Sequence, residues 1–148
     1  MISRRAFLAA AGGAALAAAG APARATQAAV DEAVRALTGG AEVRKGRVKL
    51  DVPPLIDNGN AVAAVVSVDS PMTEADHVRS IHLFAPGNPL PVMLGVFLGP
   101  RAGRARITTR LRVADSQTLS AIAQLSDGSF WSDSVSVVVT IAACTEDR

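Results

Sequence analysis

The sequence predicts an all-β fold, an immunoglobulin-like antiparallel β-sandwich of about seven strands with one short N-terminal helix. Short apolar segments recur between residues 46 and 141 at the spacing typical of sandwich strands. Turns rich in Gly, Pro, Asn and Asp separate these segments. No segment with helical periodicity lies between them, which argues against alternating helices and strands.

The elements follow in order along the chain. Apolar residues recur at helical spacing over residues 28–37, and Thr38-Gly39-Gly40 follows as a stop signal. From Gly46 onward apolar residues alternate with charged ones, and Pro53-Pro54 closes this first strand. The remaining strands are expected at residues 61–68, 78–84, 92–98, 105–113, 118–125 and 135–141.

The first 25 residues have the organisation of an export signal. The segment Ser3-Arg4-Arg5-Ala6-Phe7-Leu8 opens an apolar stretch of about 14 residues, too short for a permanent membrane anchor. Ala23 and Ala25 supply the small residues that a signal peptidase requires. The paired Arg4 and Arg5 predict recognition by the twin-arginine system, with an ordinary secretory signal as the alternative. Either route predicts a periplasmic protein whose mature chain begins at Thr26.

The sequence patterns divide the chain into four parts. We expect a signal peptide at 1–25, a helical segment at 26–45, a β-sandwich at 46–141 and a cysteine-bearing tail at 142–148. The mature part keeps 123 of the 148 residues, which suits one domain. It holds 12 Lys and Arg against 13 Asp and Glu, because three arginines leave with the leader. This balance indicates no nucleic-acid partner.

The two histidines do not form a metal site in the predicted fold. His77 and His82 are five residues apart in an expected strand, so their side chains point to opposite faces and cannot share an ion. The chain also has no Cys-x-x-Cys pair, phosphate-binding glycine loop or glycine-flanked serine elbow. We therefore expect no metal, no cofactor and no autonomous catalytic centre.

A row of arginines marks the strand expected at residues 105–113. The apolar residues of this strand share one parity and face the core. Four arginines share the other parity and face outward: Arg104, Arg106, Arg110 and Arg112. Like charges two residues apart repel, so such a row normally has acidic neighbours on adjacent strands or on a partner protein. A solvated outer face is one interpretation of the row. A docking face for an acidic partner or a small oxyanion is the other.

Cys144 is the single cysteine of the chain. In an oxidising compartment it cannot form an internal disulfide, so it is buried and inert, paired with another molecule, or kept for chemistry. It lies a few residues beyond the last expected strand, on a tail without a bulky anchor. That placement suits a covalent carrier whose sulfur enters another protein's cleft, and a leftover exposed cysteine is the alternative.

Several ordered segments resemble the SoxY family, the sulfur-carrier proteins of periplasmic thiosulfate oxidation. The resemblance covers nearly all of the mature chain. The segments that carry it are Pro54-Leu-Ile-Asp-Asn-Gly-Asn60, Val68-Asp-Ser-Pro-Met-Thr-Glu-Ala-Asp-His77, Ile81-His-Leu-Phe-Ala-Pro-Gly-Asn-Pro89, Leu98-Gly-Pro-Arg-Ala-Gly-Arg104, Thr109-Arg-Leu-Arg-Val-Ala-Asp-Ser-Gln117 and Ser126-Asp-Gly-Ser-Phe-Trp-Ser132.

The resemblance implies an immunoglobulin-like subunit that pairs with the partner SoxZ and is exported with it as a folded complex. It implies that Cys144 holds sulfur intermediates covalently, while separate thiosulfate-loading, sulfate-hydrolysing and sulfane-oxidising Sox enzymes act on them. The protein would then be a carrier without turnover of its own.

The tail departs from the family's usual Gly-Gly-Cys-Gly-Gly ending. Ala142 and Ala143 precede the cysteine, and Thr145-Glu146-Asp147-Arg148 follows it. Alanine restricts the backbone more than glycine does, and the two carboxylates disfavour both a thiolate and the approach of a dianion. One alternative is therefore a carrier-like paralogue with a structural or regulatory role. Another is a thiol hydrolase that pairs Cys144 with a histidine.

Overall fold

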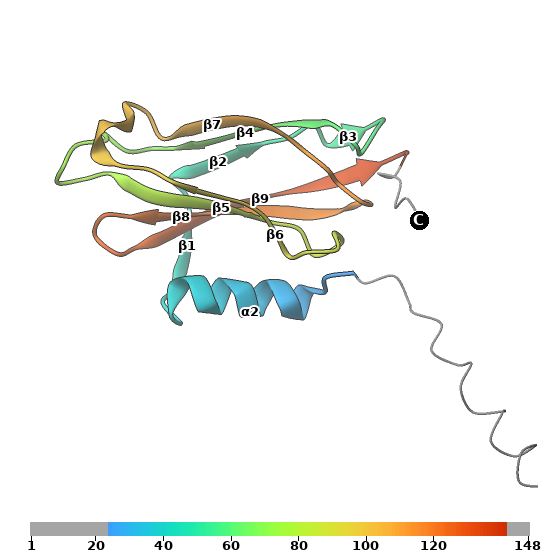
Figure 1. Ribbon diagram of the computed structural model, residues 1–148, viewed down its shortest axis with the longest axis horizontal. Helices are drawn as coiled ribbons and strands as arrows, with labels where there is room; N and C mark the ends of the chain where they lie inside the picture. Colours follow the sequence, from blue (N-terminus) through green and yellow to red (C-terminus); the bar gives the residue numbers. More distant parts are fainter. Residues whose placement is uncertain (1–23, 142–148) are drawn as a thin grey trace, which may run out of the picture.

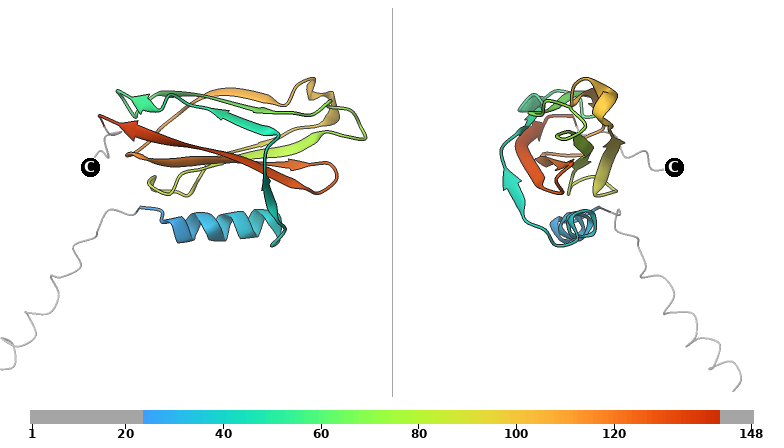
Figure 2. Two further views of the ribbon diagram at one scale, coloured as in Figure 1. Left: turned by 180° about the vertical axis from the view of Figure 1, so that it is seen from behind. Right: turned by 90° about the vertical axis from the view of Figure 1, so that its left-hand side faces the viewer.

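A computed structural model describes residues 24–141 as three stacked layers. A three-stranded sheet packs on a larger sheet, and helix α2 lies against the other face of the larger sheet (Figure 1). The end-on view shows the strands of the two sheets above α2, which lies outside the sandwich (Figure 2). The predicted all-β sandwich with one N-terminal helix is therefore confirmed.

Helix α2 runs from Gln27–Thr38, within one residue of the prediction at each end. The Thr26 side chain caps its first turn by accepting a hydrogen bond from the Ala29 N–H at 3.2 Å. Gly39 ends the helix in the left-handed conformation, with φ of 63°, which glycine adopts without steric cost. Val30 packs with the sheet residues Phe84, Ile122 and Phe130, and this small cluster attaches the helix to the domain.

The larger sheet has the order β1-β9-β8-β5-β6, with β3 also paired to β9. The three long strands at its centre are β9, β8 and β5, and each pairs antiparallel with the next. The short strands β1 and β3 pair with β9 in parallel. The bounds are β1 Val43–Lys45, β3 Leu55–Ile56, β5 Val78–Phe84, β6 Val92–Phe97, β8 Gln117–Leu125 and β9 Phe130–Val139.

The smaller sheet has the order β2-β4-β7, and both of its pairs are antiparallel. Its bounds are β2 Val48–Asp51, β4 Val62–Val68 and β7 Arg106–Leu111. Burial alternates strictly along β2 and β4, as the period-two pattern predicts for strands with one face on a core. A short 3-10 helix at Pro100–Ala102 connects β6 to β7 between the two sheets.

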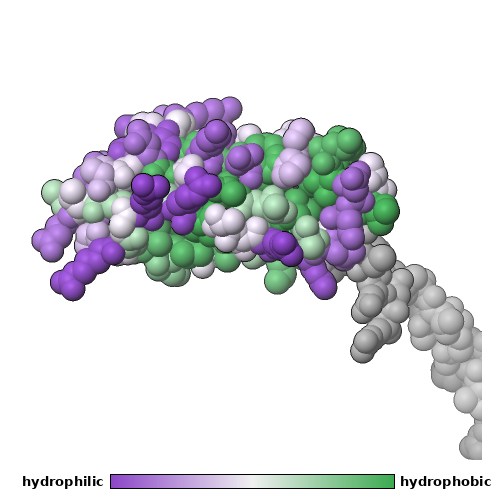
Figure 3. All heavy atoms as spheres, turned by 90° about the horizontal axis from the view of Figure 1, so that it is seen from above, coloured by the Kyte–Doolittle hydropathy of each residue, from purple (hydrophilic) through white to green (hydrophobic). Residues whose placement is uncertain are grey.

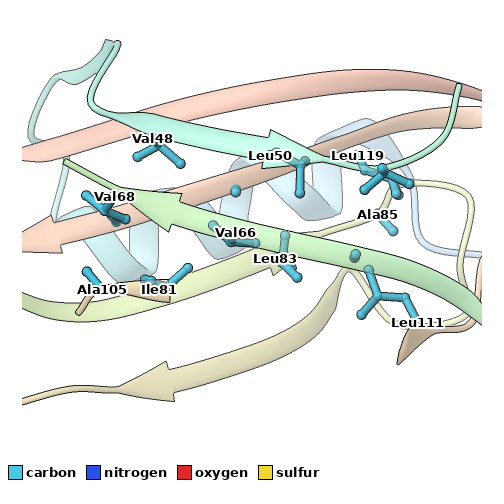
Figure 4. Packing of buried hydrophobic residues seen from close by; sticks show 14 of the residues in the cluster. Val48, Leu50, Val66, Val68, Ile81, Leu83, Ala85, Ala105, Leu111 and Leu119 are labelled. Atoms are coloured by element: carbon cyan, nitrogen blue, oxygen red, sulfur yellow. The ribbon is translucent and has the colours of Figure 1, made fainter. Parts of the chain in front are cut away.

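The core lies between the two sheets and is almost entirely aliphatic. Both sheets contribute to it, with Val48, Leu50, Val66 and Val68 from the smaller sheet and Ile81, Leu83 and Leu119 from the larger (Figure 4). These residues are the apolar members of the predicted alternating strands. Their burial supplies the main driving force that holds the sandwich together.

Two features of the strand pattern differ from the sequence prediction. Strands β1 and β3 are additional, because segments of three and two residues carry too little periodicity to be recognised. Strand β9 begins at Phe130 instead of Val135, because Phe130 and Trp131 pair with Gln124 and Ala123 of β8 across a tight Asp127-Gly128 turn. Within residues 24–141, no helix has the length and apolarity needed to cross a membrane.

Candidate functional site

The end of β9 is the part of the described structure nearest to Cys144 in sequence. Its backbone is held by the segment around β3: the Val138 N–H donates to the Pro54 carbonyl at 2.8 Å and the Thr140 N–H to the Ile56 carbonyl at 2.9 Å. The Gly59 N–H donates to the Ile141 carbonyl at 3.0 Å. Backbone hydrogen bonds therefore fix the chain as far as Ile141.

The Thr140 side chain adds to this attachment. Its hydroxyl lies 3.3 Å from the Ile56 carbonyl oxygen and 3.1 Å from the Asp57 carbonyl oxygen. The β3 segment follows Pro53-Pro54, whose missing N–H groups prevent it from simply continuing β2. The chain turns there and places Leu55 and Ile56 beside Val138 and Val139.

Cys144 lies outside the described residues, as do Arg4, Arg5 and Ala23 of the predicted leader. At the other boundary, Ala25 is described, and its N–H donates to the Asn88 carbonyl at 2.8 Å. The predicted cleavage after Ala25 falls immediately before Thr26, the residue that caps α2.

The structure places all four arginines of the predicted row on the exposed side of the smaller sheet. Arg106 and Arg110 lie in β7, while Arg104 precedes the strand and Arg112 follows it. Leu111 and the flanking Ala105 and Val113 take the opposite parity and are buried. We call these four arginines the arginine row.

The neighbours of the arginine row carry no acidic side chain on the adjacent strand. Arg106 pairs with Ser67 of β4, and Arg110 pairs with Ala63. Lys49 of β2 lies beyond Ser67 on the same line across the sheet. No salt bridge found within residues 24–141 includes an arginine of the row. Strand β4, which pairs with β7, therefore supplies none of the acidic neighbours expected for the row.

Two hollows flank the arginine row. One of about 320 Å³ lies between the β6 and β7 edges, lined by Leu90, Val92 and Met93 together with Arg110 and Arg112. The other, of about 210 Å³, is more polar and includes Arg104 and Arg106 among its lining residues. Hydrophilic side chains spread over this face of the molecule, while hydrophobic ones gather toward the end where β3 lies (Figure 3).

The two histidines have separate environments. His77 precedes β5, and its Nδ1 lies 3.1 Å from the Thr73 carbonyl oxygen. His82 is within β5 and packs edge-on against Phe97 at 5.8 Å. In the described part of the chain, no three His, Cys, Asp or Glu side chains gather closely enough to hold a metal ion.

His82 sits in an apolar setting that weakens its basicity. Its Nε2 is buried without a hydrogen-bond partner among the described residues. A Cβ at Gly95 would lie only 3.1 Å from the His82 Nδ1, so glycine on β6 makes room for the ring. Burial lowers the pKa of His82 below its ordinary value of 6.5, because the cationic form loses hydration.

Sequence reasoning missed the exposed apolar residues around the end of β9. Leu55, Val138 and Ile141 are all exposed. The sequence predicts no strand at Leu55, because Pro53-Pro54 ends the preceding β segment. The usable signal was the run Val137-Val138-Val139, since consecutive apolar residues in a strand place one of them away from the core.

Comparisons with known proteins point to one family. The family model of the sulfur oxidation protein SoxY matches residues 34–144. A search of curated proteins found no match. The sulfur carrier protein SoxY from Chlorobium limicola f thiosulfatophilum has a similar structure, with a TM-score of 0.65 and 23% identity over 77% of this chain and 98% of that one.

Other similar structures share the fold. A superoxide reductase (neelaredoxin) from Ignicoccus hospitalis has a TM-score of 0.56 and 23% identity, covering 64% of this chain and 80% of its own. A putative superoxide reductase from Thermotoga maritima has a TM-score of 0.54 and 21% identity, covering 66% and 87%. At such identities the structural likeness indicates the fold alone.

The family match is the more specific finding. It begins within α2, includes every strand and ends at Cys144. The chain is a β-sandwich protein and belongs to the SoxY family of sulfur oxidation proteins.

We predict that His82 makes the stability of the domain depend on pH near neutrality. Because its folded pKa lies below 6.5, the unfolded chain binds the proton more readily. The contribution of His82 to the free energy of unfolding should therefore be greatest above pH 6.5 and should decrease as the pH falls from 6.5 toward the folded pKa. His82→Gln should flatten this part of the profile. Urea denaturation of both proteins between pH 7.5 and 5 measures the difference, and identical profiles would contradict the prediction.

Proposed function

We propose that this protein is a periplasmic sulfur carrier that holds thiosulfate-derived intermediates on Cys144. Membership of the SoxY family, with a match that ends at Cys144, is the observation that carries the proposal. The attachment of β9 supports it further. The chain is bonded to the β3 segment up to Ile141, so the thiol lies only three residues beyond a fixed point.

The chemistry requires a second protein at each step. Joining the Cys144 thiolate to the outer sulfur of thiosulfate forms one S–S bond and releases one electron pair, which an electron-accepting cofactor of the loading enzyme must take. Hydrolysis then adds water across the bond to the sulfonate group, releasing sulfate and one proton and leaving a protonated persulfide on the cysteine. Sulfane-oxidising and hydrolysing enzymes would process what remains. In this scheme the carrier has no turnover of its own and needs no cofactor.

Export and assembly complete the proposal. The leader 1–25 directs the chain through the twin-arginine system, and the mature protein comprises the helical segment 26–45, the sandwich 46–141 and the tail 142–148. A SoxZ-like subunit pairs with it and travels as part of the folded complex. The position of Thr26 as the helix cap supports this division, because cleavage there leaves α2 intact.

A second candidate is a carrier-like paralogue that has lost the mobile arm and has a structural or regulatory role. The observation that favours it is the tail itself, where Ala142 and Ala143 replace glycines and Glu146 and Asp147 follow the thiol. Both changes disfavour loading.

The arginine row gives the proposed partner a place to dock. Its neighbours on β4 are short and uncharged, and the hollow beside Arg110 and Arg112 is partly apolar. A partner surface that combines carboxylates with apolar side chains would therefore fit. Clustered exposed charges of one sign raise association rates more than they add affinity.

The leader proposal predicts that replacing Arg4 and Arg5 by lysine stops export. Lysine keeps the positive charge, so an ordinary secretory signal would still work, whereas the twin-arginine receptor requires the arginine pair. Fractionation of cells that produce each form should show uncleaved precursor in the cytoplasm for the lysine variant. Mature protein in the periplasm at the natural level would contradict the assignment.

The docking proposal predicts that the double variant Arg106→Glu and Arg110→Glu slows association with the SoxZ-like subunit. We expect a drop of roughly ten-fold or more at low salt and a weaker salt dependence, with little change in the unfolding midpoint. Arg35→Glu with Arg79→Glu is the matched control, because it changes the net charge equally on exposed residues elsewhere. Equal association rates for the two double variants across a salt series would contradict the docking proposal and show that the arginine row is a solvated outer face.

The carrier proposal predicts that Cys144→Ser, as the sole copy in the cell, abolishes thiosulfate oxidation. The folded domain and partner binding should be unaffected, because Cys144 follows the last residue held by these backbone hydrogen bonds, Ile141. Replacing Ala142 and Ala143 by glycine and neutralising Glu146 and Asp147 should instead speed loading, since the backbone gains freedom and the thiolate meets less repulsion. Thiosulfate consumption and adduct formation measure both effects. Full oxidation by the serine variant would support the paralogue.

A further inference from the structure

The exposed large apolar residues of the described chain fall into two groups. One group lies on and before β6 and comprises Leu90, Val92 and Phe97. The other surrounds the end of β9: Leu55 is 61% exposed, Val138 56% and Ile141 61%. We call this second group the apolar rim.

Strand pairing and backbone hydrogen bonds hold the residues of the apolar rim in place. Leu55 and Val138 are paired across β3 and β9, so they lie on adjacent strands about 4.8 Å apart and on the same face. The next pair, Ile56 and Val139, faces the core. The hydrogen bond from Gly59 to the Ile141 carbonyl continues this attachment. The backbone therefore holds apolar side chains in water at a fixed position.

A hollow of about 240 Å³ adjoins the rim. It is lined by Leu55 and Ile56 together with Pro53, Ala61 and Val62, and Asp57 is its single charged residue. A hollow of this size accepts one large apolar side chain. Exposed apolar patches beside such hollows are typical of protein interaction sites.

The length of the tail determines what must come close to the rim. Cys144 is the third residue after Ile141, so the two Cα atoms lie at most about 11 Å apart. An enzyme that encloses the sulfur in its active site must bring the entrance of that site within this distance of Ile141. The apolar rim falls inside the area that the entrance covers.

We propose that the apolar rim docks an apolar lip at the active-site entrance of the thiosulfate-loading enzyme. The inference rests on the carrier function proposed for Cys144 and adds the surface on which the enzyme recognises the carrier. A contact of this small size binds weakly and dissociates quickly. That suits a carrier that must leave one enzyme before it meets the next.

The test compares Leu55→Ser with Val138→Thr, as a double variant, against the natural chain. Loading of Cys144 by the loading enzyme and thiosulfate is followed by intact mass over a range of carrier concentrations. We expect the KM for the carrier to rise roughly ten-fold with kcat unchanged, because the lost contact serves binding and not the chemical step. Alkylation of Cys144 by iodoacetamide should keep its rate, since a small reagent needs no docking surface.

The matched control is Phe97→Ser, which removes an exposed apolar side chain from β6, at the opposite edge of the larger sheet from β3 and outside the hollow beside the arginine row. Its KM should stay at the natural value. An unchanged KM in the rim variant, or equal rises in both variants, would overturn the docking inference while adduct formation on the natural chain keeps the carrier function. A rim variant that instead loses the SoxZ-like subunit, or breaks a self-association of the natural chain, would also overturn it. If the natural chain acquires no adduct, the carrier function fails and the inference fails with it.

Discussion

The pairing of β9 is the constraint on which the rest of the molecule depends. This strand pairs with β8 along most of its length and with the short strands β1 and β3 along its other edge. It thus connects the sandwich core to the segment that follows α2 and to the turn after Pro53-Pro54. Backbone hydrogen bonds continue through Thr140 to Ile141, the last residue that the structure describes.

The carrier function proposed for Cys144 makes two opposing demands, and the end of β9 bears on the second of them. The sulfur must reach into other proteins, which needs freedom, and each enzyme must find it in a defined place, which needs a fixed origin. Backbone bonds to Ile56 and Gly59 supply the fixed origin, and the short tail limits the reach. Recognition then has to come from surfaces of the domain itself. Two such surfaces differ in chemistry, since the arginine row is cationic and the apolar rim is almost uncharged.

The sequence predicted the fold well because its apolar segments are short and are separated by turn residues. Helix α2 and the strands β2, β4, β5 and β8 were placed within one or two residues, since each is a compact apolar segment with turn or stop residues at its ends. The exposed side of the arginine row also followed from parity. What parity could not provide was pairing: strands β1 and β3 are too short to recognise, and their parallel pairing with β9 joins residues some 80 positions apart.

The candidate site was predicted unevenly for the same reason. Cys144 stood out by its residue type and position, which require no knowledge of packing. The apolar rim depends on Leu55 meeting Val138 across a pair of strands, and no local pattern contains that contact. The burial of His82 beside Phe97 likewise arises from the pairing of β5 with β6.

The central claim is that Cys144 carries sulfur in the cell. It is tested most directly by the intact mass of the mature protein isolated, without reductant, from cells that are oxidising thiosulfate. The account predicts a chain that begins at Thr26 and carries sulfur adducts that map to Cys144 and disappear on reduction. A bare Cys144 thiol throughout active oxidation would contradict it.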